Sequence, residues 1–299
     1  MQQPLKIALA TCSTLPEWEV DDEPFFQALK NQNIEIFHPC WDDSDFDWDG
    51  CDLVIPRTTW DYQSRSEQFA QWLERVDQCS FLLNPLSLIK WNLNKTYLKD
   101  LSIAQPPTIW LSKTISSSST PRPNLQKLLN QKGWSKGFIK PVVGANSWGT
   151  IRFDQENHQS IKDAQIHLDQ WIQTHDLILQ PYYKSVETEG EFSLIFFNGK
   201  WSHGVQKVPV LGDYRVQDDY GAKDYPWNPP SEWKSQTLTL INNLPICPLY
   251  ARADFLKDDS GDPRLIELEL IEPSLFFRHD SDSPHRFVTA ILDHLKVGY

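Results

Sequence analysis

The chain has 299 residues, 40% of them hydrophobic, so it can bury a sizeable core and form two or three subdomains. Its formal net charge of -12 argues against nucleic acid or an anionic membrane as a partner and favours a small-molecule substrate. Five cysteines without C-x-x-C spacing, a short apolar run at residues 5–10 and no run approaching a membrane span predict a soluble cytoplasmic protein, without indicating an oligomeric state.

The first part of the chain alternates strand-like and helix-like segments. Five segments carry these patterns: strands at 6–10, 34–38 and 51–56, and helices at 23–31 and 67–76. Such alternation predicts an α/β unit with a parallel sheet covered by helices, which we place at residues 1–91. Because small ligands collect at the carboxyl ends of parallel strands, the loop 57–62 is a candidate substrate site of this Rossmann-like unit.

The charged residues of this loop have two interpretations. Arg57 and Asp61, with Thr59 between them, could bind the carboxylate and ammonium groups of an amino-acid-like substrate. Alternatively, Arg57 and Asp61 pair with each other and only shape the loop. Under the first interpretation, the loop faces residues of the C-terminal part of the chain and determines specificity with them: Arg252, Glu272 and Ser274.

Two lysines lie beside features that suit phosphate binding. Lys95 follows Asn94, a good helix N-cap, and a lysine at a helix start is unfavourable unless an anion is bound. The strand 138–141 contains Lys140 and leads into a glycine loop, 144–149, whose backbone N–H groups could approach a phosphate. The alternatives are a solvated Lys95 and an ordinary turn between two strands, and the loop is not a Walker A loop.

Two further strand patterns follow, at 177–183 and 192–197, and on periodicity alone they form a hairpin. Exposed backbone after the first strand could bind the edge of an adenine, and Glu191 could bind ribose hydroxyls. The proline-rich segment 224–233 predicts an irregular loop.

An apolar strand at 265–271 carries two carboxylates, Glu267 and Glu269, on one face because side chains alternate along a strand. A preceding strand at 250–256 and a turn-forming segment predict a hairpin that places Asp254 opposite this pair. Three converging carboxylates repel one another unless a cation neutralises them, and their hard oxygen atoms suit magnesium or manganese. The alternative is a half-exposed strand whose acids simply face water.

The order of these parts resembles the ATP-grasp superfamily, in the branch of prokaryotic glutathione synthetase. The resemblance covers residues 92–277 and is strongest to the ligases that include the O-ureido-serine cyclo-ligase of cycloserine biosynthesis. Three further motifs look like that group, at 56–62, 83–85 and 268–276. The resemblance implies a mixed α/β (α+β) chain with an ATP-grasp fold. Its parts would be an N-terminal pre-ATP-grasp domain (1–91), a lid subdomain (92–183) and a C-terminal subdomain with the metal site (184–299).

The resemblance also implies roles for individual residues. Those for ATP are Lys95, Lys140, Gly144, Ser147, Gly149, Gln180, Pro181, Tyr182, Tyr183 and Glu191; those for magnesium or manganese are Asp254, Glu267 and Glu269. Lys207, Arg215 and Arg252 are the catalytic candidates, and each has the alternative of an ordinary charged surface residue. Two positions depart from the family pattern: Glu269 stands where Asn is frequent, and Ser193 where many relatives have arginine. His203, His279 and His285 lack metal-ligand spacing and receive no role.

The implied function is that of an ADP-forming ligase that joins or cyclises amino-acid-like substrates. ATP would convert a carboxylate into an acyl phosphate, which an amine attacks through a tetrahedral intermediate whose negative charge needs fixed cations. Two alternatives remain open: a small-molecule kinase on the same fold, and a nucleotide-binding module without chemistry.

Overall fold

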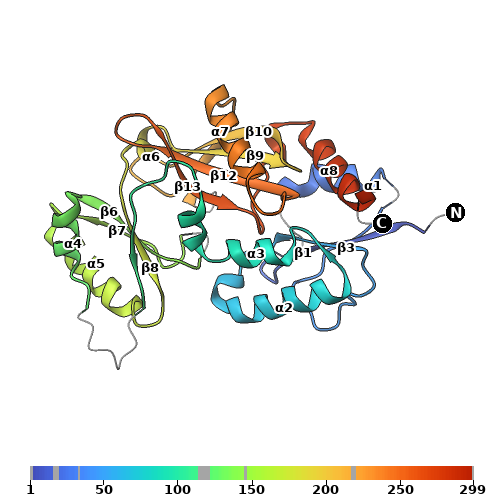
Figure 1. Ribbon diagram of the computed structural model, residues 1–299, viewed down its shortest axis with the longest axis horizontal. Coiled ribbons are helices and arrows are strands. Elements are labelled where there is room, and N and C mark those ends of the chain that lie inside the picture. Colours follow the sequence, from blue (N-terminus) through green and yellow to red (C-terminus); the bar gives the residue numbers. More distant parts are fainter. Residues whose placement is uncertain are drawn as a thin grey trace.

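The computed structural model describes residues 3–15, 20–32, 34–113, 122–144, 147–216 and 220–297. Its strands form three sheets, and Figure 1 shows them following one another along the length of the molecule. Residues 145 and 146 of the predicted glycine loop lie outside the described residues. Within the described ranges, no helix is both long and apolar enough to cross a membrane.

The first sheet is parallel, as the alternating pattern predicts. Its strands, in the order β2-β1-β3-β4, are β1 (Leu5–Thr11), β2 (Ile34–Phe37), β3 (Leu53–Thr58) and β4 (Phe81–Leu82). Side chains alternate along β1, so Ile7 packs with α1 (Glu23–Lys30) and Ala8 packs with α2 (Ser66–Cys79). The two helices therefore cover opposite faces. Two short 3-10 helices, η1 (Val20–Asp22) and η2 (Tyr62–Arg65), precede them.

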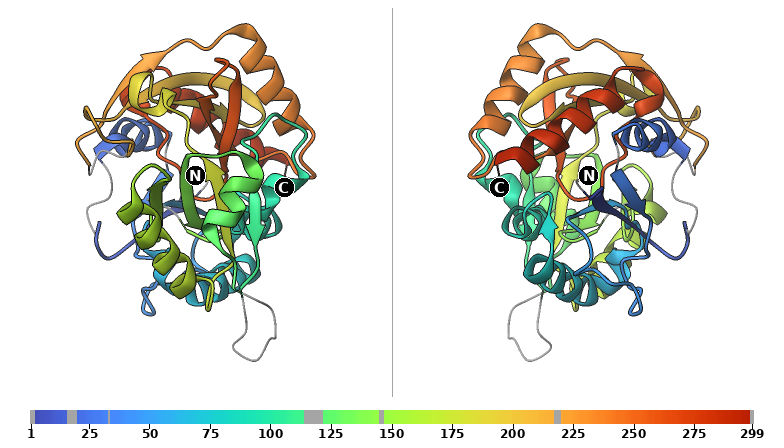
Figure 2. Two further views of the ribbon diagram at one scale, coloured as in Figure 1. Left: turned by 90° about the vertical axis from the view of Figure 1, so that its left-hand side faces the viewer. Right: turned by 90° about the vertical axis from the view of Figure 1, so that its right-hand side faces the viewer.

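The second sheet lies at the other end of the molecule and is antiparallel (Figure 1). Its strands, in the order β5-β8-β6-β7, are β5 (Ile109–Leu111), β6 (Lys136–Pro141), β7 (Ile151–Asp154) and β8 (Leu177–Pro181). The helices α4 (Leu125–Lys132) and α5 (His158–Trp171) bury Leu129 and Leu168 against it. The left view of Figure 2 shows both helices on the outer side of this sheet.

The third sheet is central and antiparallel. Its strands, in the order β11-β10-β9-β12-β13, are β9 (Glu191–Phe197), β10 (Lys200–Val208), β11 (Lys223–Trp227), β12 (Tyr250–Lys257) and β13 (Pro263–Glu269). β9 pairs with β10 and β12, whereas β8 belongs to the second sheet, so the predicted hairpin of 177–183 with 192–197 is wrong. The remaining short helices are α3 (Leu86–Asn92), η3 (Lys95–Asp100), α6 (Ser185–Thr188) and η5 (Phe277–His279).

The predicted irregular loop at 224–233 is also wrong. Most of β11 lies in this segment, and Ser231 begins α7 (Ser231–Asn242). β11 is an edge strand, where Pro226 is tolerated because a strand at the edge leaves one side of its backbone unpaired. β11 forms because it pairs with β10, and the proline-rich sequence of this segment gives no local sign of that pairing.

The opposite edge of the central sheet, β13, is held by side chains from the segment that follows the first sheet. Asn92 donates to Leu268 O (2.7 Å) and accepts from Leu270 N (2.9 Å), and the Tyr97 hydroxyl accepts from Leu268 N (2.8 Å). Buried Asn84 likewise donates to Leu270 O at 2.7 Å. These bonds satisfy backbone groups that an edge strand leaves unpaired, and they hold the strand that carries Glu267 and Glu269.

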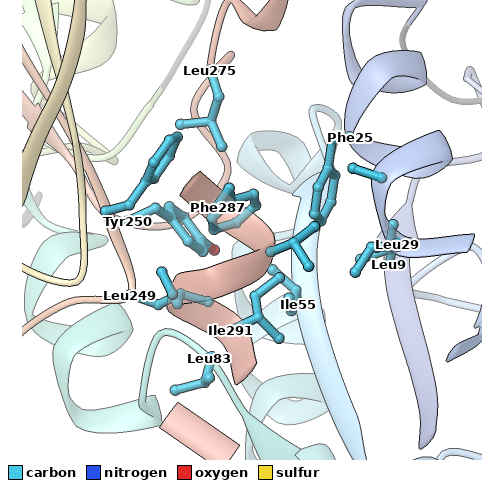
Figure 3. Close-up of a cluster of buried hydrophobic side chains, with 14 of the residues drawn as sticks. Leu9, Phe25, Leu29, Ile55, Leu83, Leu249, Tyr250, Leu275, Phe287 and Ile291 are labelled. Atoms are coloured by element: carbon cyan, nitrogen blue, oxygen red, sulfur yellow. The ribbon is translucent and has the colours of Figure 1, made fainter. Parts of the chain in front are cut away.

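The first and third sheets share one hydrophobic core. Figure 3 shows Phe25 and Ile55 of the N-terminal unit near Tyr250 and Phe287, which come from the C-terminal part of the chain. Phe287 lies on α8 (Ser283–Val297), which packs beside α1 (Figures 1 and 2). The two parts are therefore joined by packed apolar side chains as well as by the chain itself.

Candidate active site

A cavity of about 300 Å³ is lined by residues from all three parts of the chain. Of the residues predicted for the site, sixteen line it: Lys95, Lys140, Gly144, Ser147, Gln180, Pro181, Tyr183, Glu191, Lys207, Arg215, Arg252, Asp254, Glu267, Glu269, Glu272 and Ser274. Five predicted residues do not: Arg57, Thr59, Asp61, Gly149 and Tyr182.

The acidic face forms as the sequence predicts. In the antiparallel register of β12 and β13, Asp254 lies opposite Glu267, and Arg252 lies opposite Glu269. Arg252 donates to Asp254 Oδ2 at 2.9 Å and also to Glu269 Oε1. Lys95 Nζ lies 2.7 Å from Glu267 Oε1. The acids therefore share one face of the sheet, but in this structure protein cations contact them.

Strand β9 adds a second charged pair beside this face. Glu191 forms an ion pair with Lys207, whose Nζ also lies 3.7 Å from Asp254 Oδ1. Ser193 donates from its hydroxyl to Asp254 Oδ1 at 2.6 Å. The serine that departs from the family pattern is thus a buried hydrogen-bond partner of the central carboxylate.

Burial and neighbouring charge act in opposite directions on these carboxyl groups. Burial raises the pKa of Asp254, but Arg252 and Lys207 outweigh it, so the pKa lies below its ordinary value. Burial likewise raises the pKa of Glu267, yet the adjacent lysines Lys95 and Lys140 bring it below the ordinary value. Both groups are therefore carboxylates at neutral pH.

Glu269 behaves differently. Burial raises its pKa to about 8; Arg252 opposes the rise, and the Glu267 and Asp254 carboxylates add to it. Without a metal, Glu269 is therefore largely protonated at neutral pH; a divalent cation such as magnesium, which suits hard oxygen donors, would favour its ionised form. Among the described residues, no group of three or more Asp, Glu, His or Cys side chains is already arranged around a metal position. The carboxylate oxygens are suitable ligands for the metal, but in this structure lysine and arginine side chains pair with them.

Lys95 and Lys140 line the same cavity. Lys95 is buried, with 8% of its surface exposed, and its Nζ lies 2.5 Å from Gly144 O. The alternative of a solvated Lys95 is therefore wrong. The predicted cap is present, because the Asn94 side chain accepts from Thr96 N at 2.9 Å, although the helix that starts here is the 3-10 helix η3. Burial lowers the pKa of Lys140.

The glycine loop joins β6 to β7, and aromatic packing anchors its C-terminal end. Gly149 has φ +65°, and a Cβ there would lie 2.4 Å from the Trp171 ring. Trp148 packs edge-on against Trp171, with ring centroids 4.8 Å apart, and Gly149 O lies 2.9 Å from His167 Nε2. The described part of the loop therefore needs glycine at 149 for close approach to α5.

The strand β8 brings Gln180, Pro181 and Tyr183 to the cavity, but Tyr182 is directed elsewhere. Its hydroxyl bonds Glu187, and its backbone N–H donates to Lys136 O at 3.0 Å. The sequence predicts exposed backbone at this point. The Tyr182 N–H is instead paired with β6, one residue beyond the last strand pair, Gly137 with Pro181.

The loop after β3 departs most from its predicted role. Arg57 is buried and pairs with Asp22 at 2.8 Å, so the alternative pairing with Asp61 is wrong. Asp61 instead accepts from Trp41 Nε1 at 2.6 Å and pairs with Arg65. Direct substrate binding by Arg57, Thr59 and Asp61 stays a prediction that this geometry does not favour.

Several cavity residues escaped the sequence analysis. Trp60 lines the cavity and donates from Nε1 to Glu272 O at 2.9 Å, and Phe276 and Arg278 line it beyond Ser274. Burial raises the pKa of Glu272 to about 7, while a hydrogen bond with Tyr62 opposes the rise. The spacing of Glu272, Ser274 and Phe276, two residues apart, could have suggested that they share one side of the chain. Only the structure shows that this side lines the cavity.

Arg215 lines the cavity beside an aromatic cluster. It is partly exposed, pairs with Asp213 at 2.7 Å and stacks its guanidinium 3.9 Å from the Tyr220 ring centroid. Next to it, Tyr214 packs against Phe138 of β6, with centroids 4.9 Å apart. Of the three catalytic candidates, Lys207 and Arg252 are buried within the charged face, whereas Arg215 is not.

The second sheet, the central sheet and the lysine and carboxylate groups between them define the class of protein: the chain has the ATP-grasp fold. Structures of that fold superpose along nearly its whole length. D-alanine–D-alanine ligase from Bacillus anthracis, solved with ATP, gives a TM-score of 0.64 at 16% identity, covering 99% of this chain and 98% of that one. The ATP-grasp ligase PsnB, solved with Mg and ADP, gives 0.62 at 11% identity, covering 98% and 99%.

Within this fold the chain is similar to the cycloserine biosynthesis protein DcsG of Streptomyces lavendulae. The two are 28% identical over 303 residues, covering 97% of this chain and 99% of that protein. The crystal structure of D-cycloserine synthetase DcsG gives a TM-score of 0.85 at 24% identity, covering 97% and 99%. The family model for the N-terminal domain of D-cycloserine synthetase DcsG matches residues 7–84. The predicted resemblance to ATP-grasp ligases of the cycloserine type is confirmed.

Proposed function

We propose that the chain is an ATP-dependent, ADP-forming ligase or cyclo-ligase that acts on amino-acid-like substrates through an acyl phosphate. One observation carries the proposal: a single cavity brings Lys95 and Lys140 of the lid against the carboxylates of β12 and β13. Two lysines beside carboxylate oxygens suit a nucleoside triphosphate with its divalent cation, because the lysines can bind the phosphates and the carboxylates the cation. The similarity to DcsG along nearly the whole chain supports the same chemistry.

Each part of the cavity has a role in this proposal. Lys95 and Lys140 hold the ATP phosphates under the glycine loop, while Gln180, Pro181 and Tyr183 hold the adenine. Asp254, Glu267 and Glu269 hold magnesium or manganese, which would neutralise charge on the phosphates. Glu191 contacts the ribose, although Lys207 pairs with it in this structure. The units 1–91, 92–183 and 184–299 then supply substrate contacts, lid and metal site, respectively.

The amine side of the reaction belongs to the end of the cavity near Glu272. A carboxyl group whose pKa is raised to about 7 can accept a proton from an amine near neutral pH. Arg252, fixed by Asp254 and Glu269, is the cation we place nearest the tetrahedral intermediate, where fixed positive charge stabilises the developing oxyanion. Trp60 and Phe276 cover this end with apolar surface, which protects an acyl phosphate from water.

The similarity to DcsG supports a single substrate molecule that carries both the carboxylate and the amine, so that ligation closes a ring. The ATP requirement and five free thiols support a cytoplasmic location.

The test is a screen for ADP release with the purified chain, magnesium and ATP. Both enantiomers of O-ureido-serine, D-alanine, and a panel of amino acids and dipeptides serve as candidate acids. Added hydroxylamine, which competes with the amine of the substrate, traps an acyl phosphate as a hydroxamate. A ligase gives ADP together with a hydroxamate. ADP with a phosphorylated product and no hydroxamate indicates the kinase, and no ADP with any acid indicates the binding module.

A further inference from the structure

The segment 272–278, here called the recognition segment, presents alternate side chains to the cavity. Those that line it are Glu272, Ser274, Phe276 and Arg278. The segment is not one extended strand, because Phe276 has φ +51° and Phe277–His279 form η5. Glu272 and Ser274 flank Pro273, so a small shift of the backbone at Pro273 moves both side chains together. The direction of these groups therefore depends on what holds the backbone.

Side chains from outside the segment form hydrogen bonds with six of its backbone polar groups. The contacts are Trp60 Nε1 to Glu272 O (2.9 Å), Arg57 Nη1 to Pro273 O (3.1 Å), Arg252 Nη1 to Ser274 O (3.2 Å), His203 Nε2 to Leu275 O (2.9 Å), and Asp21 to the N–H groups of Phe277 and Arg278 (both 3.2 Å). Three of these five side chains, Asp21, Arg57 and Trp60, come from the N-terminal unit.

The ion pair of Arg57 with Asp22 fixes the direction of one further hydrogen bond, from Arg57 Nη1 to Pro273 O. Asp22 accepts from its Nε and Nη2, each at 2.8 Å, which leaves Nη1 directed at Pro273 O. Both side chains are almost fully buried, at 3% and 4% exposure, so the pair is fixed in orientation. Lysine offers a single ammonium in place of this planar fork and cannot satisfy both partners with the same geometry.

We propose that Arg57 is a positioning residue for substrate specificity: it acts through Pro273 O to set the directions of Glu272 and Ser274 in the cavity. The N-terminal unit then influences substrate recognition without its charged loop touching the substrate. This inference rests on the proposed function for the identity of the substrate. Arg57 would affect specificity through its hydrogen bond to Pro273 O, and not through the direct substrate contact that the sequence predicts.

Two variants separate positioning from stability. Arg57→Lys keeps the positive charge near Asp22 but loses the fork. The double variant Arg57→Met with Asp22→Leu removes the donor without leaving a buried charge unpaired. In both, we expect the KM for O-ureido-serine to rise tenfold or more, as loss of a charged hydrogen bond commonly does, while the KM for ATP changes less than about twofold. Hydrogen exchange across 272–278 should become faster in both.

Arg75→Ala is the matched control, because Arg75 is an exposed arginine of α2 in the same unit. It should leave both KM values and the exchange of the recognition segment unchanged. An unchanged KM for O-ureido-serine with unchanged exchange in the two variants would overturn the proposal. So would an equal rise in both KM values, which indicates a merely structural role. If the unaltered chain does not turn over O-ureido-serine, the proposed function fails for that acid, and the exchange comparison still decides whether Arg57 positions the segment.

Discussion

Glu272 is a titratable residue of the cavity whose charge state changes in the neutral pH range. It is buried at the cavity wall, its pKa is raised to about 7 by burial, and the Tyr62 hydroxyl and the more distant Arg252 lower it only in part. Glu267 opposes its ionisation from the same cavity. Below this pKa Glu272 is a neutral acid, and above it a carboxylate able to accept a proton.

We predict that kcat/KM for the amine-bearing substrate rises with pH through about 7, and that Glu272→Gln loses this rise. Stability has the opposite sign. The folded-state pKa lies above the ordinary value of 4.5, so the folded protein holds this proton more tightly than the unfolded chain. The free energy of unfolding of the unaltered chain, relative to Glu272→Gln, should therefore fall as pH rises from 4.5 to about 7. Rate profiles and urea unfolding at several pH values check both parts, and parallel rate profiles would contradict the assignment.

Glu267 tests the metal assignment. Glu267→Gln keeps the shape of the side chain and removes the negative charge next to Lys95. Turnover should fall by at least the roughly 10- to 100-fold that loss of a group supporting a metal ligand costs. Calorimetric titration with MgATP should show weaker binding. The control variant Glu232→Gln, at the exposed start of α7, should keep both the turnover and the MgATP affinity of the unaltered chain. Full activity in Glu267→Gln would remove the carboxylate from the metal site.

At the scale of elements, the edge strand β13 is held by amide side chains from a distant segment. Asn92→Leu preserves volume but leaves Leu268 O and Leu270 N without their partner. Each buried backbone group left unpaired costs about 1–3 kcal/mol, so the variant should lower the free energy of unfolding by at least that amount. Asn130→Leu, at an exposed position of α4, should change it by less than about 0.5 kcal/mol. Equal unfolding midpoints in urea for both variants would contradict the role of Asn92.

The glycine loop is the element we expect to change on nucleotide binding. Its C-terminal end is packed on Trp171, so closure would move the part near Gly144, which contacts Lys95. Hydrogen exchange across 142–150 should slow when a nonhydrolysable ATP analogue and magnesium are added, because closure excludes water from the acyl phosphate. Exchange at β7 serves as an internal reference. Equal protection with and without nucleotide would count against a lid.

At the scale of the whole molecule, we expect the first and third sheets to unfold cooperatively, because they share the core around Phe287 (Figure 3). Phe287 is fully buried, packs at a tilt against Phe25 and stacks on Phe197. Phe287→Ala should lower the free energy of unfolding by about 3–5 kcal/mol. Hydrogen exchange should then quicken in β1 and β9 alike. Phe81→Ala, at a residue 43% exposed, is the control. Faster exchange in β9 alone would show that the two sheets unfold independently.

Local patterns in the sequence predicted a large part of this architecture. The 3.6-residue spacing of Phe69, Trp72 and Val76 in α2 depends only on neighbouring residues, as does the alternation around Glu267 and Glu269. The turn between β12 and β13 is equally local, so the pairing of Asp254 with Glu267 followed from the sequence. The ordered set of lysines, glycines and acids then indicated the ATP-grasp resemblance.

Only the tertiary structure decided which distant groups meet. Arg57 has Asp22 as its partner because both are buried together, and an unpaired buried charge is costly, whereas in sequence Asp61 was the nearer acid. Trp60 reaches Glu272, 212 residues away, and thereby joins the N-terminal unit to the recognition segment. The strand β11 forms because β10 offers it a partner, despite its proline. Periodicity is a property of neighbours along the chain, whereas burial and charge pairing depend on the complete fold, and these decided the wall of the cavity where we place the substrate.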